Sequence, residues 1–224
     1  MQTIFALYVE RDVRTIKNVS DLNTFQRFLQ LCAGRVGQIL NLSSLGNDCG
    51  IDHKTATSWL SILEASYIIF LLRPYYQNFG KRVIKSPKLY FVDKGILCSL
   101  LRIKSSDELI EHYLRGNIIE SFIISNLFKQ FYNLDKRPHI YFWRDSQGHE
   151  IDCLIDQALQ AVPIEIKASK TISMHYFDHL NYWKDLTKSS TDRFVIYSSD
   201  GNQNCLGAKV ISWKSSGNLI KDIY

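Results

Sequence analysis

The pattern of apolar and polar positions becomes regular at Asp21, where apolar residues begin to recur at steps of three and four. This spacing places them on one face of a helix, which Ser20 or Asp21 would cap. The apolar positions are Leu22, Phe25, Phe28, Leu29, Cys32, Ala33 and Val36. A second, short helix is predicted over residues 43–48, opened by Ser43 or Ser44, and a third over residues 53–66, capped by Asp52.

Two strand-like runs follow the third helix, over residues 67–73 and 88–93, and a basic loop joins them. Three helices followed by a β-hairpin predict a winged helix-turn-helix. In the DNA-binding form, the third helix enters the major groove and the basic wing meets phosphate. We therefore expect nucleic-acid contacts from His53, Lys54, Thr57, Lys81, Arg82 and Lys85. The alternative is that the unit serves only as a packing module.

A second pattern begins after the polar break at residues 104–106. The helical segment 117–131 has too broad an apolar face for a surface helix and should pack against a sheet. Strands are predicted at 139–144, 150–156, 162–167, 193–198 and 209–213, with a helix at 174–188 between the third and fourth. This order predicts a mixed sheet with helices on its faces. We expect a connector over residues 1–20, a winged-helix domain over 21–104 and an α/β (α+β) domain over 105–224.

Three charged residues in this second domain are placed where they could form a metal-binding site. Glu165 and Lys167 are two residues apart in an apolar strand, so they share a face, and Asp152 belongs to the preceding strand. Two carboxylates and an ammonium together suffice to hold a divalent cation such as Mg²⁺ or Mn²⁺ and to orient a water molecule. Glu120, set among apolar residues of the segment 117–131, is expected either to face the same cleft or to lie at the surface.

Interpretations without a catalytic role stay open for these residues and their neighbours. Glu165 and Lys167 can form a buried ion pair without catalytic function, or a solvated strand edge. Arg144 can contact phosphate or pair with Asp152. His149 lies beside a turn, where histidines are usually exposed. His175 and His179 are four residues apart on a helix, a spacing that suits a metal, but the sequence shows no third ligand with them.

Charge and composition refine these expectations. Residues 1–105 hold 14 Lys and Arg against 7 Asp and Glu, a net charge of +7, whereas the remainder carries −2. The first half can attract a polyanion, and the second concentrates acids of the kind that metal sites use. The five cysteines are scattered, which indicates small buried residues rather than disulfides or zinc ligands. No apolar run is long enough to cross a membrane and no secretory signal is evident, so we expect a cytoplasmic protein.

The order of elements and acids resembles the restriction-endonuclease-like fold, whose signature is an acid on one strand and Glu or Asp, any residue, then Lys on the next. Here that signature is Asp152, twelve residues, then Glu165, Ile166 and Lys167. The helix before it often carries a further acid, which Glu120 matches. The resemblance implies a metal-dependent phosphodiester hydrolase with Asp152, Glu165 and Glu120 as metal ligands and Lys167 as a catalytic residue.

Longer phrases of the sequence resemble the C-terminal region of prokaryotic AAA-type ATPases. These are YVERDV, CAGRVGQILNLSSLG, KTATSWLSILE, KRVIKSPKLYFVDKGIL, GNIIESFI, FWRDSQGHEIDCLID and PIEIKASKTI. In that family a P-loop ATPase module precedes a winged helix and a nuclease-like domain of uncharacterised function. The chain has no G-x-x-x-x-G-K-[ST] motif, so we expect no ATP site and no ATPase activity from it alone. The resemblance implies DNA and an ATPase module or further copies as partners, and makes residues 1–20 the remnant of a missing module.

Overall fold

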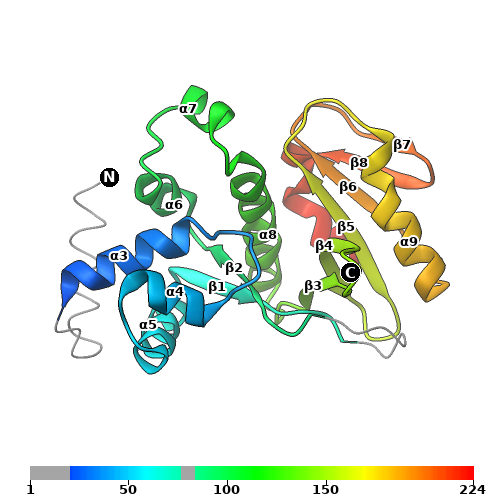
Figure 1. The fold of residues 1–224 in the computed structure, drawn as a ribbon. Coiled ribbons are helices and arrows are strands. Elements are labelled where there is room, and N and C mark those ends of the chain that lie inside the picture. The colour runs from blue at the N-terminus through cyan, green and yellow to red at the C-terminus, as the bar shows by residue number, and fades with distance from the viewer. Residues whose placement is uncertain (1–20, 77–83) are drawn as a thin grey trace. The chain divides into compact units, whose positions relative to one another are not determined.

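The computed structural model describes residues 21–76 and 84–224, so the connector predicted at 1–20 lies outside the described residues. The described chain is mixed α/β and divides into two compact units (Figure 1). The first unit comprises the chain up to Leu71 together with Lys88–Ser121. The second comprises Leu72–Pro87 together with Phe122–Tyr224. The sequence predicted a single boundary near residue 104, whereas the chain passes between the units at three points.

The first unit is built from short helices and a two-stranded sheet. In chain order its elements are α3 (Leu22–Ala33), α4 (Leu42–Cys49), α5 (His53–Ala65), β1 (Ile69–Leu72), β2 (Lys88–Phe91), α6 (Lys94–Leu100), α7 (Ser106–Glu111) and the start of α8 (Arg115–Asn133). The three predicted helices and two predicted strands are therefore present. The short helix α7 was not predicted, because its six residues carry too few apolar positions to show a period.

Polar side chains fix where the first helices begin. Asp21 accepts a hydrogen bond from the Thr24 N–H at 3.0 Å, and Asp52 accepts one from the Thr55 N–H at 2.7 Å, as predicted. The predicted cap of α4 was wrong. Asn41, rather than Ser43 or Ser44, accepts from the Ser44 N–H at 3.0 Å, so the helix begins earlier.

Aromatic residues lock the helices of the first unit together. The Trp59 ring on α5 lies edge-on to Phe25 and Phe28 on α3, with ring centroids 5.2 and 5.5 Å apart. Phe25 and Phe28 are completely buried and Trp59 nearly so. Since aromatic pairs favour this T-shaped geometry, one helix is held against the other. Trp59 is therefore a core residue of the first unit.

The second unit contains a six-stranded mixed sheet with the order β3-β4-β5-β6-β8-β7. The strands are β3 (Ile140–Arg144), β4 (Glu150–Asp156), β5 (Ala161–Lys167), β6 (Phe194–Tyr197), β7 (Gln203–Cys205) and β8 (Ala208–Ser212). β3, β4 and β5 form an antiparallel meander, and β6 and β8 then continue parallel to β5. The predicted mixed sheet is confirmed.

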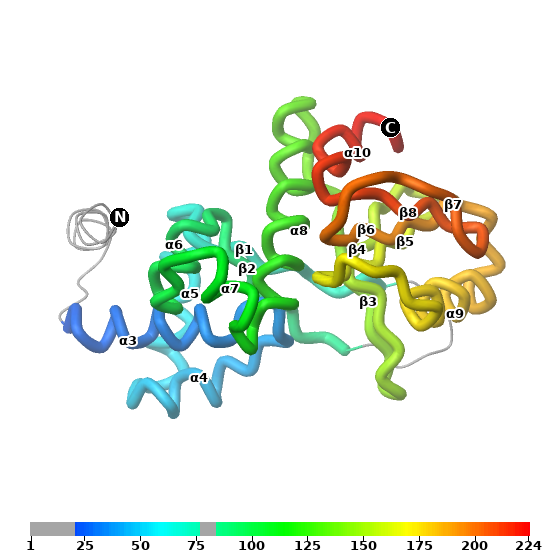
Figure 2. Tube along the Cα trace, turned by 90° about the horizontal axis from the view of Figure 1, so that it is seen from above, coloured from blue at the N-terminus to red at the C-terminus, as the bar shows by residue number. Residues whose placement is uncertain are grey.

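Helices cover both faces of this sheet. On one face lie the 3₁₀ turn η2 (Met174–Phe177) and α9 (Asp178–Thr187), and on the other lies α10 (Leu219–Ile223), which follows the 3₁₀ turn η3 (Trp213–Asn218) (Figures 1 and 2). Under α9, Trp183 packs edge-on to Trp143 of β3 at 5.2 Å between ring centroids. Burial of these two large rings accounts for much of the attachment of α9, since fully burying one aromatic side chain contributes roughly 1.5–3 kcal/mol.

The connection between β1 and β2, predicted as the wing, belongs to the second unit. The Tyr75 N–H donates to the Phe142 carbonyl at 2.7 Å, and the Ile84 N–H donates to the Arg144 carbonyl at 3.1 Å. The described ends of this segment therefore lie along the outer edge of β3. Three helices followed by two strands agree with the predicted order, but the described ends of the connection are bound to β3.

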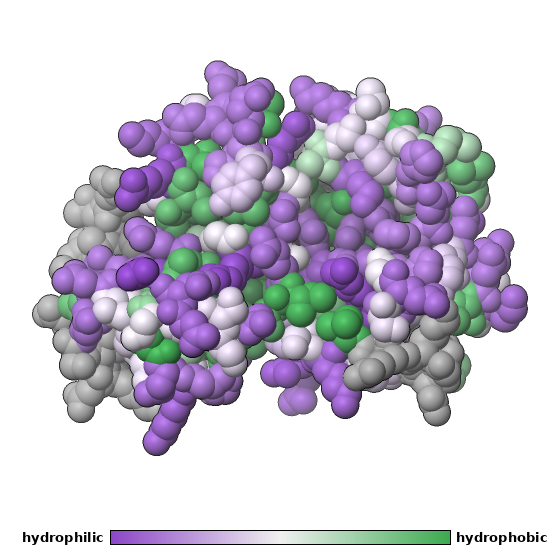
Figure 3. All heavy atoms as spheres, viewed as in Figure 1, coloured by the Kyte–Doolittle hydropathy of each residue, from purple (hydrophilic) through white to green (hydrophobic). Residues whose placement is uncertain are grey.

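One face of the described chain is mainly polar (Figure 3). Figure 3 shows hydrophilic residues over most of the displayed face, with hydrophobic residues gathered in a few smaller areas. Among the described residues, no helix is both long enough and apolar enough to span a bilayer.

Candidate functional site

Asp152 lies at an irregularity in the sheet. Tyr141 of β3 is opposite Leu154, but Trp143, two residues on, is opposite Ile151, so β4 carries one extra residue at this point. At this point two residues of β4, Asp152 and Cys153, lie opposite the single residue Phe142 of β3. A β-bulge of this kind bends a strand and re-aims its side chains, and bulges are common beside active sites.

The bulge turns the Asp152 carboxylate toward the backbone of β5. Regular pairing of β4 with β5 ends at Cys153 and Ile164. Beyond that pair, Asp152 Oδ2 accepts the Ile166 N–H at 2.8 Å. The carboxylate thus takes the place of a backbone carbonyl in the ladder and holds Asp152 beside the Glu165–Lys167 segment.

Asp152, Glu165 and Lys167 come together as predicted. Lys167 Nζ lies 2.5 Å from Glu165 Oε1 and 3.8 Å from Asp152 Oδ2. Glu165 is almost entirely buried, whereas the Lys167 side chain keeps 28% of its surface exposed. One ammonium therefore lies between two carboxylates at a point that solvent reaches, so the interpretation as a fully solvated strand edge does not fit Glu165.

The helix side of this cluster was not predicted. His179 on α9 places Nδ1 3.9 Å from Glu165 Oε1, and Lys167 Nζ lies 5.8 Å from the centre of the Tyr176 ring. His175 is in the 3₁₀ turn, is 88% exposed and pairs with Asp178 at 3.2 Å. His175 and His179, whose spacing suited a metal but lacked a third ligand, therefore lie in different elements and each faces a different acid.

Glu120 finds its partners in the first unit. Its Oε1 accepts from Lys88 Nζ at 3.1 Å and from the Tyr90 hydroxyl at 2.5 Å. Lys88, predicted to open the second strand-like run, is a buried residue at the start of β2. The burial cost of the Glu120 carboxylate is therefore met by an ion pair and a hydrogen bond. A shared cleft for Glu120 and Asp152 stays a prediction.

A second charged group lies in the turn between β3 and β4. Asp145 is buried and binds His149, whose ring stacks on Tyr182 of α9. This group was not predicted, since His149 was expected to be exposed beside a turn. The available signal was the spacing: an Asp that opens a Gly-containing turn can bind the N–H groups and side chain two to four residues later. Arg144, beside it, pairs with Glu150 at 3.2 Å rather than with Asp152.

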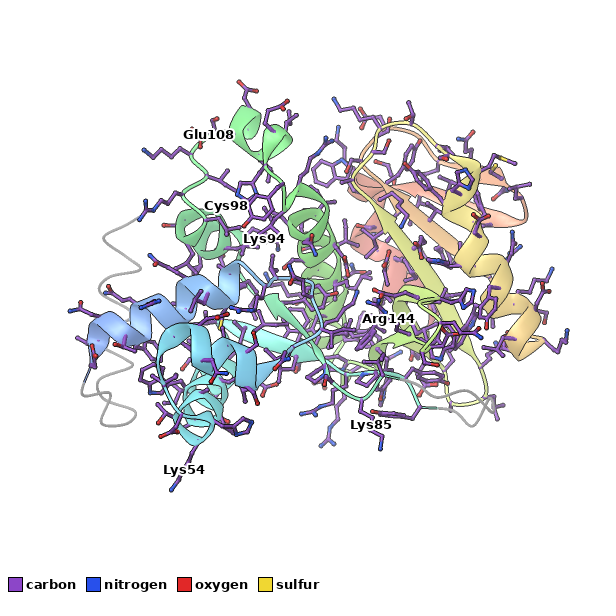
Figure 4. All side chains as sticks on the ribbon, viewed as in Figure 1. Lys54, Lys85, Lys94, Cys98, Glu108 and Arg144 are labelled. Atoms are coloured by element: carbon purple, nitrogen blue, oxygen red, sulfur yellow. The ribbon has the colours of Figure 1, made fainter. Side chains whose placement is uncertain are left out.

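The predicted nucleic-acid contacts of the first unit lie on one exposed side of α5. His53, Lys54 and Thr57 are exposed, and Lys54 points away from the helix (Figure 4). The Thr57 hydroxyl donates to the His53 carbonyl at 2.7 Å. Lys85 is exposed as well, in the part of the β1–β2 connection that belongs to the second unit. Lys81 and Arg82 lie outside the described residues.

A divalent cation at the cluster would rest on few protein ligands. Within residues 21–76 and 84–224, no group of three or more His, Cys, Asp and Glu side chains is arranged to hold a metal ion. Asp152 and Glu165 supply two hard oxygen donors, which suits Mg²⁺ or Mn²⁺ because these ions keep several water ligands and bind through one or two carboxylates. The donor set therefore fits such an ion, with water completing its shell.

Comparisons with known proteins divide the chain in two. Residues 1–107 match the model of a domain of unknown function, DUF8612, and residues 115–215 match that of another domain of unknown function, DUF4143. Uncharacterized proteins of Mycobacterium bovis and Mycobacterium tuberculosis are each 28% identical to this chain over 167 residues. The match covers 75% of this chain and 37% of each relative, so the chain spans little more than a third of the relatives' length.

Proposed function

We propose that the second unit is a metal-dependent phosphodiester hydrolase of the restriction-endonuclease-like type. The observation that carries the proposal is the convergence of Asp152, Glu165 and Lys167 beside a β-bulge, with the ammonium 2.5 and 3.8 Å from the two carboxylates. Asp152 and Glu165 would hold Mg²⁺ or Mn²⁺. When bound, the ion supplies Lewis acidity and offsets charge on the phosphate.

Each residue of the chain has a distinct task in this proposal. Lys167 orients the attacking water and offsets the negative charge that develops on phosphorus, a type of contribution commonly worth 10²–10³-fold in rate. Glu165 holds the Lys167 ammonium in place from its buried position. Glu120 is a further ligand only if the first unit brings it to the cluster, and its contacts with Lys88 and Tyr90 favour a structural task.

The first unit would associate the hydrolase with DNA. We propose that it is a winged helix whose α5 presents His53, Lys54 and Thr57 to the duplex, and that Lys81, Arg82 and Lys85 meet phosphate. The whole chain would then be the C-terminal part of an AAA-type ATPase-like protein. The basic first half of the sequence supports this proposal, since phosphate contacts need Lys and Arg.

Cleavage of DNA by the purified chain tests the hydrolase. Plasmid and single-stranded DNA are incubated with Mg²⁺, with Mn²⁺ and with a chelator, for the wild type and for the Asp152→Ala and Lys167→Ala variants. We expect metal-dependent cleavage that both variants lose. His175→Gln is the matched control, because it alters an exposed ion pair elsewhere on the same unit. Cleavage that persists in Asp152→Ala and Lys167→Ala would sink the proposal.

A silent nuclease-like fold is the second candidate. The 2.5 Å contact between Lys167 Nζ and Glu165 Oε1 favours it, since such a pair can be purely structural. The unit would then be a DNA-binding or protein-interaction module of an ATPase. Calorimetric titration with Mn²⁺ separates the candidates: uptake by the wild type that Asp152→Ala abolishes supports the hydrolase, and no uptake by the folded protein supports the silent module.

Salt dependence tests the DNA association. If Lys54 and Lys85 contact phosphate, the affinity for duplex DNA should fall steeply with added salt, because each contact releases condensed counterions. The double variant Lys54→Gln/Lys85→Gln should bind more weakly and with a shallower salt slope. Binding that ignores salt, or no binding at all, argues for a packing role of the first unit.

A further inference from the structure

The turn between β3 and β4 holds an acid that the proposed chemistry leaves unused. The Asp145 side chain is only 1% exposed. Its Oδ1 accepts the N–H groups of Gln147 and His149 at 2.9 and 3.0 Å. Its Oδ2 lies 3.0 Å from His149 Nδ1 and accepts from the Tyr182 hydroxyl at 3.2 Å. A turn aspartate commonly binds such N–H groups, but the second oxygen of this carboxylate also contacts the His149 ring and the Tyr182 hydroxyl.

Asp145 is held in its charged form. Burial acts to raise the pKa of the carboxyl, but the hydrogen bonds from the His149 side chain and from the Gln147 and His149 N–H groups outweigh burial, so the pKa is lowered. An ionised carboxylate can only accept hydrogen bonds. Nδ1 of His149 must therefore carry a proton toward Asp145, and Nε2 is the nitrogen that can gain and lose the second proton.

The His149 ring is also fixed in orientation. It stacks on the Tyr182 ring with 3.8 Å between centroids and 5° between planes, while the His179 ring stands edge-on at 6.4 Å. His179 in turn lies 3.9 Å from Glu165. The His179 side chain thus links the Asp145–His149 pair to the cluster of Asp152, Glu165 and Lys167. All of these residues belong to the second unit.

We propose that His149 is the proton donor to the leaving oxygen in phosphodiester hydrolysis, and that Asp145 and Tyr182 are its positioning residues. This inference rests on the proposed hydrolase function. The water oxygen bonds to phosphorus and the bond from phosphorus to the sugar oxygen breaks, leaving its electron pair on that oxygen. The sugar oxygen takes the proton from Nε2 of the His149 imidazolium. The attacking water releases its proton to solvent, and His149 regains one from solvent.

The charges around His149 suit a donor. Asp145 faces the ring from the turn, and Tyr182 and His179 face it from α9. The Asp145 carboxylate takes the hydrogen bond of Nδ1, so Nε2 is the nitrogen left to donate to the leaving oxygen.

A substrate with sulfur in place of the leaving oxygen tests proton donation directly. A thiolate leaves without help from an acid, because thiols ionise near pH 8.5 whereas the sugar hydroxyl does not. On the oxygen substrate His149→Gln should lose about 10²–10⁴-fold in rate, the usual range for general acid catalysis. On the sulfur substrate it should cleave within a few-fold of the wild type, while Asp152→Ala stays inactive on both.

The outcomes separate the two proposals. Equal losses on both substrates, or no loss on either, would overturn proton donation by His149 and leave the hydrolase intact. A wild-type protein that cleaves neither substrate would contradict both the hydrolase proposal and proton donation by His149. His175→Gln is the matched control: it also removes a histidine paired with an aspartate, but one whose side chain is 88% exposed, and it should behave as the wild type.

An NMR titration tests the positioning without any substrate. The imidazole ¹⁵N signals of His149 should show Nδ1 protonated in the neutral ring, and Asp145→Asn should weaken this tautomer preference, because the carboxylate that accepts from Nδ1 is missing. Asp178→Asn should leave His149 unchanged. A His149 ring protonated at Nε2 in its neutral form, or a tautomer preference that Asp145→Asn leaves unchanged, would contradict the assignment.

Discussion

Each unit contains a lysine and a glutamate in contact, and the two pairs differ in what surrounds them. In the first unit, the Lys88 and Glu120 side chains are 4% and 14% exposed, and the Tyr90 hydroxyl donates a second hydrogen bond to Glu120. In the second unit, Lys167 is 28% exposed and lies between Glu165 and a second carboxylate, Asp152. The first pair is neutral overall and closed, while the second cluster has excess negative charge and is open.

The difference separates a structural ion pair from a candidate site. A buried pair with no charge left over stabilises an existing packing and has nothing to offer a ligand. A cluster with one carboxylate more than its cations, reached by solvent, can exchange an internal contact for a cation or a water molecule. Residue type alone does not distinguish the two pairs, since both are one lysine with one glutamate.

The largest effect should come from breaking the closed pair. Lys88→Met leaves the Glu120 carboxylate buried without its cation, and we expect the free energy of unfolding to fall by about 3–5 kcal/mol. Urea denaturation measures it. The double variant Lys88→Met/Glu120→Gln should recover much of that loss because it removes the charge as well. A double variant no more stable than Lys88→Met would contradict the assignment of Glu120 to this pair.

Removing the cation of the open cluster should instead cost activity. Lys167→Met leaves the buried Glu165 carboxylate without its cation, so it should also lower the free energy of unfolding, but by less than Lys88→Met, because solvent reaches the Lys167 position and can replace part of the lost contact. Cleavage should fall by about 10²-fold or more, equivalent to about 2.7 kcal/mol in barrier height. The same urea titration, run beside a cleavage assay, compares the two pairs. A stability loss as large as that of Lys88→Met would make the clusters equivalent.

Asp145 gives an effect of intermediate size that depends on pH. Asp145→Asn weakens charge-assisted hydrogen bonds, so we expect a loss of about 2 kcal/mol near neutral pH. Because the folded-state pKa is lowered, the wild-type advantage is full above the ordinary Asp pKa of about 3.9 and disappears as pH falls through the folded value. Thermal unfolding between neutral and acidic pH measures it. An advantage that grows on acidification would contradict the lowered pKa.

The smallest effect concerns a polar group that serves only the backbone. Asn41→Ala removes the cap of α4 and should cost about 1 kcal/mol in the free energy of unfolding. Ser43→Ala, at one of the positions favoured by the sequence, is the control and should be nearly neutral. If the Ser43 variant proved the more damaging of the two, the observed start of α4 would be in error.

Hydrophobic periodicity predicted most of the elements because each long helix and strand buries one face. It missed α7, β7 and α10, which have six, three and five residues and too few apolar positions to show a period. The sequence also predicted the N-terminal caps of α3 and α5 correctly, because an aspartate directly before a helical apolar pattern commonly serves as the N-cap.

The candidate site was only partly accessible from the sequence. Asp152 lies on β4 and Glu165 and Lys167 lie on the neighbouring strand β5, so their spacing in the sequence was enough to predict that they meet. Contacts made across the fold left no such trace: His179 reaches Glu165 from α9, and Lys88 finds Glu120 from a strand 32 residues away. Such partners are set by how helices pack on strands, which one sequence does not encode in any local pattern.

The segment between β1 and β2 has a consequence for how this protein can be handled. Its bonds from Tyr75 and Ile84 occupy the outer side of β3, an edge strand that would otherwise offer unpaired backbone groups to another chain. A fragment starting at Phe122 would lack that cover and should self-associate through β3. Because the chain enters the second unit twice, isolating that unit requires Leu72–Pro87 to be supplied as well, for instance as a fused strand ahead of β3.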